Sequence, residues 1–275
     1  MITHPEKVLF PDVGITKGEL AAYYDAVASV MLPHLRRRPI TMERFPGGIA
    51  AKGFIQKDVS KGFPAWLKRV EATKKGGVVH YPLAGNRQSL EWLANQNAVT
   101  LHVWTSRAPR LERPDICVLD LDPSREDPGA LRGVMLALKN ILDELGHESW
   151  VKTSGSKGFH VILRMPARAT FDDSSSLADA IARRLVERLP DEVTQAFAKA
   201  DRHDRIYIDT ARNRPGATFA AAYTVRARPG SPVSAPCTWD EVSSGTVHPQ
   251  TFTLRAMEAR LAGVGDLWKP LGAAR

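Results

Sequence analysis

The sequence predicts a mixed α/β (α+β) protein with a central, mostly antiparallel sheet flanked by helices. Segments with the two-residue alternation of strands are interspersed with segments that have the helical period. Strand–turn–strand units recur, whereas the strict strand–helix–strand rhythm that indicates a parallel sheet is missing. No internal repeat or linker divides the 275 residues, so we predict a single domain, residues 1–275, built as two lobes.

The first half of the chain begins with a helix start. Thr16 and Glu19 form a T-x-x-E capping box. Apolar side chains follow at helical spacing, and we expect this helix to stop near Pro33. The further elements expected in this half are strands over 40–45 and 53–58, a short helix over 88–96 and an alternating strand over 98–104.

The second half begins with an apolar run that ends in DLDP and leads into a helix. The apolar face of this helix extends to Leu145, and Gly146 closes it. The stretch ESWVKTSGSKGFHVILRM predicts two strands joined by a Gly-Ser turn. In order, we expect a strand over 114–123, the helix over 131–145, the strand pair within 148–165, a helix over 174–189, strands over 205–209 and 217–228, and a helix near 250–262.

The composition favours an anionic partner. The formal charge is +8 and the pI is near 9.6, which points first to nucleic acid and second to an anionic small substrate. The sequence has no apolar stretch of ~18 residues and no signal peptide, so we expect a cytoplasmic, nucleoid-associated protein without a membrane partner. Cys117 and Cys237 lack C-x-x-C neighbours, so we expect neither a zinc site nor a disulfide.

Two carboxylates stand one residue apart in VLDLDPS. Alternate side chains of a strand share a face, so Asp120 and Asp122 should point the same way while Leu121 points into the core. Such close carboxylates repel each other, and a hard divalent cation relieves the repulsion. Asp209, which ends RIYID, is a third candidate ligand for a two-metal phosphoryl-transfer site. The plainer alternative is that these acids cap the next helix or face water.

Two further features suit a phosphorylated ligand. The turn SGSKGFH, residues 154–160, has small residues that let an anion approach backbone N–H groups, and Lys157 adds positive charge. Its alternative is an ordinary hairpin turn. Arg226 and Arg228, predicted on one face of a strand, suit a triphosphate, and the alternative for them is a solvated edge.

In this order and spacing, DLDP, SGSKGFH and RIYID resemble the polymerase domain of bacterial ligase D (LigD), in the archaeo-eukaryotic primase, or primase-polymerase, superfamily. The resemblance extends from about Lys7 to the C-terminal tail and includes EKVLFPDVGITK, RFPGGIAAKGFIQK, LHVW and YTVRAR. It implies a two-lobed primase-polymerase fold. It also implies a template-directed nucleotidyltransferase that extends a primer 3′-OH at short gaps and broken DNA ends, uses two Mn²⁺ (or Mg²⁺) ions and prefers ribonucleotides.

The resemblance also assigns roles to residues of this sequence. Asp120, Asp122 and Asp209 would be the catalytic metal ligands, the first two bridging both ions and Asp209 holding the ion that activates the 3′-OH. The contacts to the incoming nucleoside triphosphate would come from His102, Ser154, Lys157, His160, Arg202, Arg226 and Arg228. The DNA contacts would come from Lys7 and Lys17 on a 5′-phosphate and from Phe54 stacked on the template.

Two departures from the family pattern bear on the pathway. Family members often have two adjacent aromatic residues where this chain has Phe54-Ile55. No K-x-D-G ligase signature occurs, so we expect no ligase or nuclease domain and a separate DNA ligase, with Ku, as partners in non-homologous end joining. A stand-alone primase-polymerase in short-gap excision repair is the alternative.

Two more distant alternatives concern the activity itself. A haloacid dehalogenase-type phosphatase also carries D-x-D after an apolar strand, but here Pro123-Ser124 follow and the motif lies far from the N-terminus. A non-catalytic DNA-binding module has only the charge and Phe54 in its favour.

Overall fold

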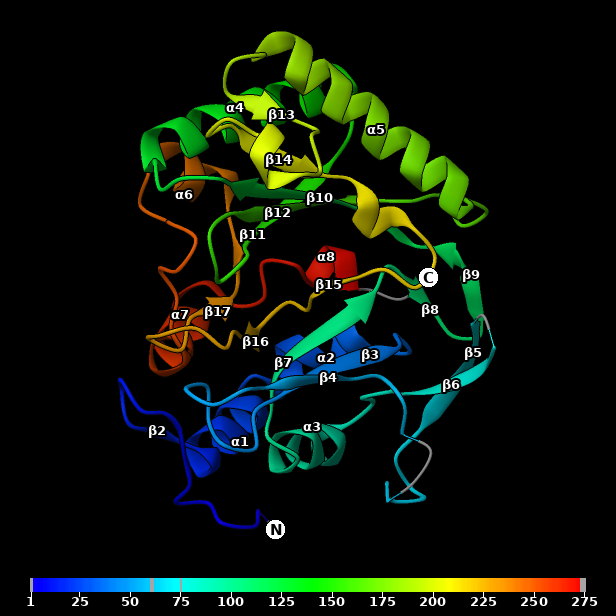
Figure 1. Ribbon diagram of the computed structural model, residues 1–275, viewed down its shortest axis with the longest axis vertical. Helices are drawn as coiled ribbons and strands as arrows, with labels where there is room; N and C mark the ends of the chain where they lie inside the picture. Colours follow the sequence, from blue (N-terminus) through cyan, green and yellow to red (C-terminus); the bar gives the residue numbers. More distant parts are fainter. Residues whose placement is uncertain (1, 60–61, 75, 273–275) are drawn as a thin grey trace.

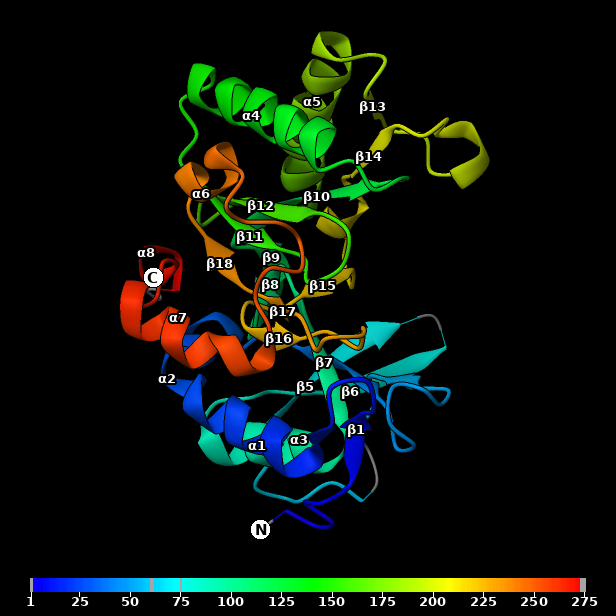
Figure 2. The same cartoon turned by 90° about the vertical axis from the view of Figure 1, so that its left-hand side faces the viewer.

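The computed structural model describes residues 2–59, 62–74 and 76–272, which form two lobes stacked along the longest axis of the molecule (Figure 1). Each lobe contains a mostly antiparallel sheet with helices on its outer side. The sheets face each other across the middle of the molecule, and the chain passes between the lobes several times (Figure 2). The predicted mixed α/β class with antiparallel sheets flanked by helices is confirmed.

The larger sheet, in the upper lobe of Figure 1, has the strand order β13-β14-β10-β12-β11-β18. All its neighbouring pairs are antiparallel except β13 and β14. Helices α4 (Pro128–Glu144) and α5 (Phe171–Arg188) cover its outer face. Its strands are β10 (Ile116–Pro123), β11 (Ser149–Thr153), β12 (Phe159–Arg164), β13 (Val193–Thr194), β14 (Ile206–Asp209) and β18 (Pro236–Cys237).

Helix α4 forms and ends as the sequence predicts. Asp127 caps its first turn by accepting a hydrogen bond from the N–H of Ala130 at 2.9 Å. Its apolar face is buried against the sheet, and Gly146 follows the last turn with φ +71°, a conformation that glycine adopts without strain.

The smaller sheet, in the lower lobe, has the order β15-β7-β3-β4 with all pairs antiparallel. Helix α3 (Arg87–Asn95) packs beneath it beside two further helices. The strands are β3 (Ile40–Arg44), β4 (Phe54–Gln56), β7 (Ala98–Trp104) and β15 (Thr218–Ala220).

The helix predicted to run from Thr16 toward Pro33 is in fact two helices, α1 (Lys17–Ala26) and α2 (Ala28–Leu35). The capping box is present, with the N–H of Glu19 donating to Thr16 Oγ1 at 3.2 Å and the Glu19 carboxylate accepting from Thr16 N–H at 2.9 Å. The helical segment ends at Leu35, near Pro33 as expected. Proline removes only one backbone donor, and α2 continues two residues past it.

The single strand predicted over 217–228 is also wrong. Its backbone breaks at Tyr223, which has φ +67° and whose hydroxyl donates to Asp266 Oδ1 at 2.7 Å. The two halves therefore join different partners: β15 pairs with β7, and β16 (Thr224–Val225) pairs with β17 (Val233–Ser234). As a result Arg226 and Arg228 lie beyond the strand and do not share a strand face.

The remaining elements are short, and most of them have no clear signal in the sequence. The strand pairs are β1 (Val8–Phe10) with β2 (Ile15–Thr16), β5 (Arg69–Lys74) with β6 (Gly77–Pro82), and β8 (Ser106–Arg107) with β9 (Arg110–Pro114). The short helices are α6 (Trp239–Ser244), α7 (Met257–Val264), α8 (Lys269–Gly272) and the 3₁₀ turns η1 (Lys199–Asp201), η2 (Ala211–Asn213) and η3 (Leu254–Ala256). The helix expected near 250–262 is thus η3 followed by α7.

Two expectations about the chain as a whole can be compared with the structure. Cys117 and Cys237 are both buried free thiols. Among the residues described, no helix is long and apolar enough to span a bilayer.

A buried arginine joins the lower lobe to the start of β10. The Arg38 guanidinium makes two hydrogen bonds to the carboxylate of Asp115, at 2.6 and 2.8 Å. It also donates to the carbonyl oxygens of Trp104 and His34, each at 3.1 Å. Arg38 is 3% exposed, so its guanidinium is shielded from water, while the Asp115 side chain is 41% exposed.

We expect Arg38→Met to lower the free energy of unfolding by about 3 kcal/mol, because it leaves buried carbonyls without donors and takes the bidentate partner from Asp115. Urea denaturation measures this loss. Arg87→Met is the matched control, since Arg87 is exposed and pairs with an exposed Asp25; it should cost less than about 1 kcal/mol. Equal losses in the two variants would contradict a stabilising role for the Arg38–Asp115 pair.

Candidate active site

The three predicted acids lie on one face of the larger sheet. Strands β10 and β14 pair with Asp120 directly opposite Asp209 and with Asp122 opposite Tyr207. Directly opposite side chains in an antiparallel pair lie ~5 Å apart on the same face. Asp122, two residues beyond Asp120, shares that face, while Leu121 is fully buried on the other side. The pairing thus brings together acids that are distant in the sequence.

Arg212 bridges two of these acids. Its Nε lies 3.2 Å from Asp120 Oδ2, and its Nη2 lies 3.2 Å from Asp209 Oδ2. The turn η2 that carries it is fixed by Asn213, whose side-chain amide bonds both the N–H and the C=O of Val118, at 2.8 and 2.7 Å. The sequence reasoning missed Arg212. The signal that could have found it is its position three residues after Asp209 on the turn that follows the strand.

The neighbours of Asp120 keep it ionised. Burial alone would raise the pKa of Asp120, but hydrogen bonds from His160 and Arg212, together with the Arg212 charge, hold this pKa well below its ordinary value. Asp122 is more exposed and pairs with Arg202 Nη1 at 3.4 Å. The Arg202 guanidinium in turn lies 4.0 Å from the centre of the Tyr207 ring.

These carboxylates fit a hard divalent cation in their chemistry, since they are oxygen donors on one face that already take cationic partners. Within residues 2–59, 62–74 and 76–272, no three acidic, histidine or cysteine side chains converge closely enough to hold a metal ion as they stand. The counter-charges in this arrangement are instead Arg212 and Arg202. The metal-ligand role of the three acids stays a prediction.

A buried chain of polar groups leads away from Asp120. His160 lies opposite it on β12, with Nε2 3.4 Å from Asp120 Oδ1 and Nδ1 2.8 Å from the Nζ of Lys152. Lys152 is fully buried and also donates to the hydroxyl of Ser234. Burial, aided by Lys152, lowers the pKa of His160 to about 4, so this imidazole is uncharged at neutral pH. An amine on one side and a carboxylate on the other favour the tautomer with hydrogen on Nε2.

The predicted turn SGSKGFH joins β11 to β12 next to the acids. The N–H groups of Ser156 and Gly158 both donate to Ser154 Oγ, at 3.1 Å each, so two donors of the predicted anion-binding turn are used internally. Lys157 is exposed and has no partner in the part of the chain that the structure describes. Arg226 reaches the same turn, donating from Nη1 to the carbonyl of Ser154 at 2.5 Å. The structure therefore brings Ser154, Lys157 and Arg226 to one place.

The other predicted nucleotide contacts lie around this turn. His102, on β7, has its Nε2 3.7 Å from the Glu43 carboxylate. Burial, with the nearby charge of Arg226, lowers the pKa of His102 below its ordinary value. Arg228 is exposed. Burial is the main cause of the lowered pKa of Arg226. The nearby charge of Arg228 lowers this pKa further, while Glu43 and Asp120 raise it.

The predicted DNA contacts lie in the lower lobe. Lys7 and Lys17 are brought together by a 2.8 Å hydrogen bond from Lys17 N–H to the carbonyl of Lys7. Lys17 is buried, and its ammonium donates to the carbonyl and hydroxyl oxygens of Thr3 at 2.7 and 3.0 Å. Burial and the charge of Lys7 lower the pKa of Lys17. Phe54 is 46% exposed on β4 with the Arg44 guanidinium 5.2 Å from its ring centre, which leaves ring surface free for stacking.

Comparison with known proteins settles the family. A family model for the LigD primase-polymerase domain matches residues 16–268. The chain belongs to this family. The multifunctional non-homologous end joining protein LigD of Mycolicibacterium smegmatis is 34% identical over 99% of this chain and 36% of its own length. The protein of the same name from Pseudomonas aeruginosa is 34% identical over 94% of this chain and 31% of its own length.

A solved structure of the LigD family shares the fold. The polymerase domain from Mycobacterium tuberculosis ligase D in complex with DNA superposes with a TM-score of 0.93 at 31% identity, covering 99% of this chain and 98% of that one. The present chain spans about a third of the length of the curated LigD proteins it matches. As a LigD primase-polymerase domain it is a DNA-directed nucleotidyltransferase, and the phosphatase and the non-catalytic module are set aside.

Proposed function

We propose that this LigD primase-polymerase domain is a template-directed polymerase that adds nucleotides to a primer 3′-OH at short gaps and broken DNA ends in non-homologous end joining. The observation that carries the proposal is the placement of Asp120 opposite Asp209 in neighbouring strands, with Asp122 on the same face and a cationic turn beside them. The names of the relatives refer to end joining, and the similar solved domain is in complex with DNA.

The chain's own side chains have distinct roles in this proposal. Asp120, Asp122 and Asp209 would supply the oxygen donors that hold two divalent cations. Two Mn²⁺ or Mg²⁺ ions bound there would offset the charge of the triphosphate and ease deprotonation of the 3′-OH. Arg212 balances the acids until the cations arrive, since it contacts both Asp120 and Asp209.

The triphosphate would lie against the turn of β11 and β12. Lys157 and Arg226 supply positive charge, and the Ser154 hydroxyl can donate outward because it only accepts within the turn. His160, whose Nε2–H faces Asp120 at 3.4 Å, would share that hydrogen with a phosphate oxygen, while Arg202 beside Asp122 and the exposed Arg228 would add positive charge. His102, whose Nε2 lies 3.7 Å from the Glu43 carboxylate, would contact the sugar or base of the incoming nucleotide, and we assign ribonucleotide preference to its surroundings.

A primer-extension series tests this function. Templates with gaps of increasing length, with and without a 5′-phosphate, are incubated with ribo- or deoxyribonucleotides and Mn²⁺ or Mg²⁺. We expect template-directed additions, best with Mn²⁺ and ribonucleotides on short phosphorylated gaps. Addition that ignores the template would contradict the proposal. In the same series, the gap lengths that the enzyme fills and its need for a 5′-phosphate distinguish two pathways. These are end joining, with a DNA ligase and Ku as partners, and short-gap excision repair by a stand-alone enzyme.

The two lysines of the lower lobe give a specific prediction. Lys7→Ala with Lys17→Ala should weaken binding to gaps with a 5′-phosphate by roughly tenfold or more, because a charge-assisted hydrogen bond contributes ~1.5–3 kcal/mol. Binding to gaps with a 5′-hydroxyl should change little. Fluorescence anisotropy on the paired substrates measures both.

Two variants serve as controls for that experiment. Lys7→Ala alone keeps the buried contact of Lys17 with Thr3 and so leaves the fold undisturbed. Lys139→Ala with Arg184→Ala removes the same charge from the outer helices and should affect both substrates equally. If the lysine variants lose binding equally on both substrates, the 5′-phosphate assignment is wrong.

A further inference from the structure

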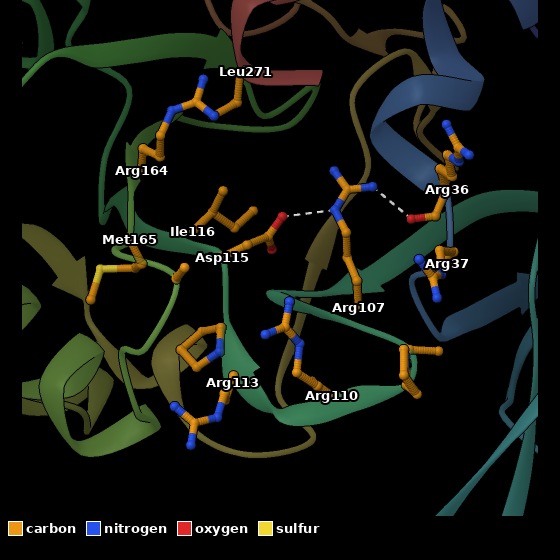
Figure 3. Close-up of a pocket in the computed structure, with 14 residues that line it drawn as sticks. Arg36, Arg37, Arg107, Arg110, Arg113, Asp115, Ile116, Arg164, Met165 and Leu271 are labelled. Atoms are coloured by element: carbon orange, nitrogen blue, oxygen red, sulfur yellow. Dashed lines mark hydrogen bonds and ion pairs between the residues drawn. The ribbon is translucent and has the colours of Figure 1, made fainter. Parts of the chain in front are cut away.

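A positively charged cavity lies at the other end of β10 from the acids (Figure 3). Its volume is about 380 Å³, in the range of small-ligand sites. Its walls come from the end of α2, the β8–β9 hairpin and the end of β12. We call its six arginines the arginine groove: Arg36, Arg37, Arg107, Arg110, Arg113 and Arg164.

The one carboxylate that lines this cavity does not balance the arginines. Asp115 is already bonded by Arg38 from behind, at 2.6 and 2.8 Å, and by Arg107 at 2.7 Å. Arg36, Arg37 and Arg110 are exposed, and their side chains have no hydrogen-bond or ion-pair partner among the described residues. The groove therefore carries uncompensated positive charge.

The backbone holds the other three arginines in place. Arg107 donates from Nη1 to the carbonyl of Arg36 at 2.6 Å, in addition to its bond with Asp115 (Figure 3). Arg113 donates to the carbonyl of Arg168 at 2.9 Å, and Arg164 donates to that of Pro270 at 2.6 Å. Guanidinium groups fixed in this way lose little freedom when they bind an anion, and their forked geometry suits phosphate oxygens.

The groove continues beyond the length of one small ligand. A neighbouring cavity of about 800 Å³ shares Arg36 and Arg37 with it and extends to Lys68. Leu32 and Leu83 also line this extension and offer apolar surface to the faces of bases. A line of separated cations beside apolar surface suits a strand with regularly spaced phosphates better than a single compact polyphosphate.

We propose that the arginine groove binds the phosphodiester backbone of a single-stranded nucleic-acid segment at a site separate from the active site. Five residues of extended chain separate Asp115 from Asp120, a distance of ~16 Å at about 3.3 Å per residue. A strand in the groove therefore does not occupy the face that carries the acids. The domain would hold one strand for synthesis and a second segment, or the distal part of the same strand, on this other surface.

Binding of oligothymidylate of about twelve residues tests the proposal, because single-strand sites cover ~4–16 nucleotides. Arg36→Glu with Arg110→Glu should weaken binding about tenfold at low salt. It should also reduce the slope of log affinity against log salt by about 1.4, since each lost contact to a single strand contributes ~0.7. Both arginines are exposed and unpartnered, so the fold should be unaffected.

Arg183→Glu with Arg184→Glu makes the same charge change on exposed positions of α5 and should alter binding at most twofold. Photo-crosslinking of thiothymidine-substituted oligonucleotide to the unmodified protein should label the β8–β9 hairpin. Equal loss in the two double variants, or no label on this hairpin, would overturn the proposal. A polyglutamate peptide would also overturn the proposal if it bound as tightly as the oligonucleotide and lost as much affinity in Arg36→Glu with Arg110→Glu. That result would indicate an acidic protein partner. Primer extension is not the readout, so this test is independent of the proposed polymerase activity.

Discussion

Asp120→Asn should reduce primer extension at least about a thousandfold while the protein stays folded. The amide keeps the shape of the side chain but removes the negative charge that lies between His160 and Arg212 and opposite Asp209. If Asp120 is a metal ligand, its loss removes several kcal/mol of transition-state stabilisation. Each loss of about 1.4 kcal/mol lowers the rate tenfold. Single-turnover extension of a gapped template with Mn²⁺ measures the effect.

Asp143→Asn is the matched control for that substitution. Asp143 is an exposed residue of α4 that pairs with Lys139, and its replacement should change the rate less than twofold. Circular dichroism should show both variants folded. An Asp120→Asn enzyme that retains a tenth of the activity would contradict the catalytic assignment.

Gly158→Ala should cost about 3 kcal/mol of stability and should reduce extension more than tenfold, even at temperatures where the variant is folded. A Cβ at this position would lie 1.7 Å from the carbonyl oxygen of Leu121 and 2.8 Å from its carbon. The clash is with backbone, so β10 and β12 must move apart. The move occurs beside Asp120 and His160, which face each other in these two strands.

Gly133→Ala provides the control for the added methyl group. Gly133 is an exposed position within α4, and a Cβ there meets nothing within 4 Å. Its replacement should stabilise the protein by up to ~1 kcal/mol, because alanine favours helix. Urea denaturation and extension rates are compared for the two variants. If Gly158→Ala behaves like Gly133→Ala, the close approach of the two strands does not matter for the site.

Local patterns in the sequence predict much of the fold. The capping box of Thr16 and Glu19 and the glycine at 146 set helix ends that the structure contains. The alternation in VLDLDPS places Asp120 and Asp122 on one face and Leu121 in the core, because the side-chain period of a strand is two. The order of three motifs was enough to indicate the family.

Features that depend on tertiary contacts were not predictable in this way. Tyr223, where the strand breaks, donates a hydrogen bond to Asp266, 43 residues along the chain, and no local pattern encodes this contact. Lys152 lies in a largely apolar strand, so the sequence alone does not mark it as part of a polar site. Its buried contact with His160 forms only when β11 and β12 pair. The arginine groove likewise combines three segments that are far apart in the sequence.

We propose that Asp120, Asp122 and Asp209 together hold two divalent ions against a nucleoside triphosphate. Mn²⁺ binding, followed by electron paramagnetic resonance with a non-hydrolysable triphosphate present, tests it most directly. In line with two-metal sites, we expect about two bound Mn²⁺ ions per chain in addition to those that the free triphosphate binds. We expect Asp120→Asn and Asp209→Asn to lose this binding. Unchanged Mn²⁺ binding in both variants would contradict the claim.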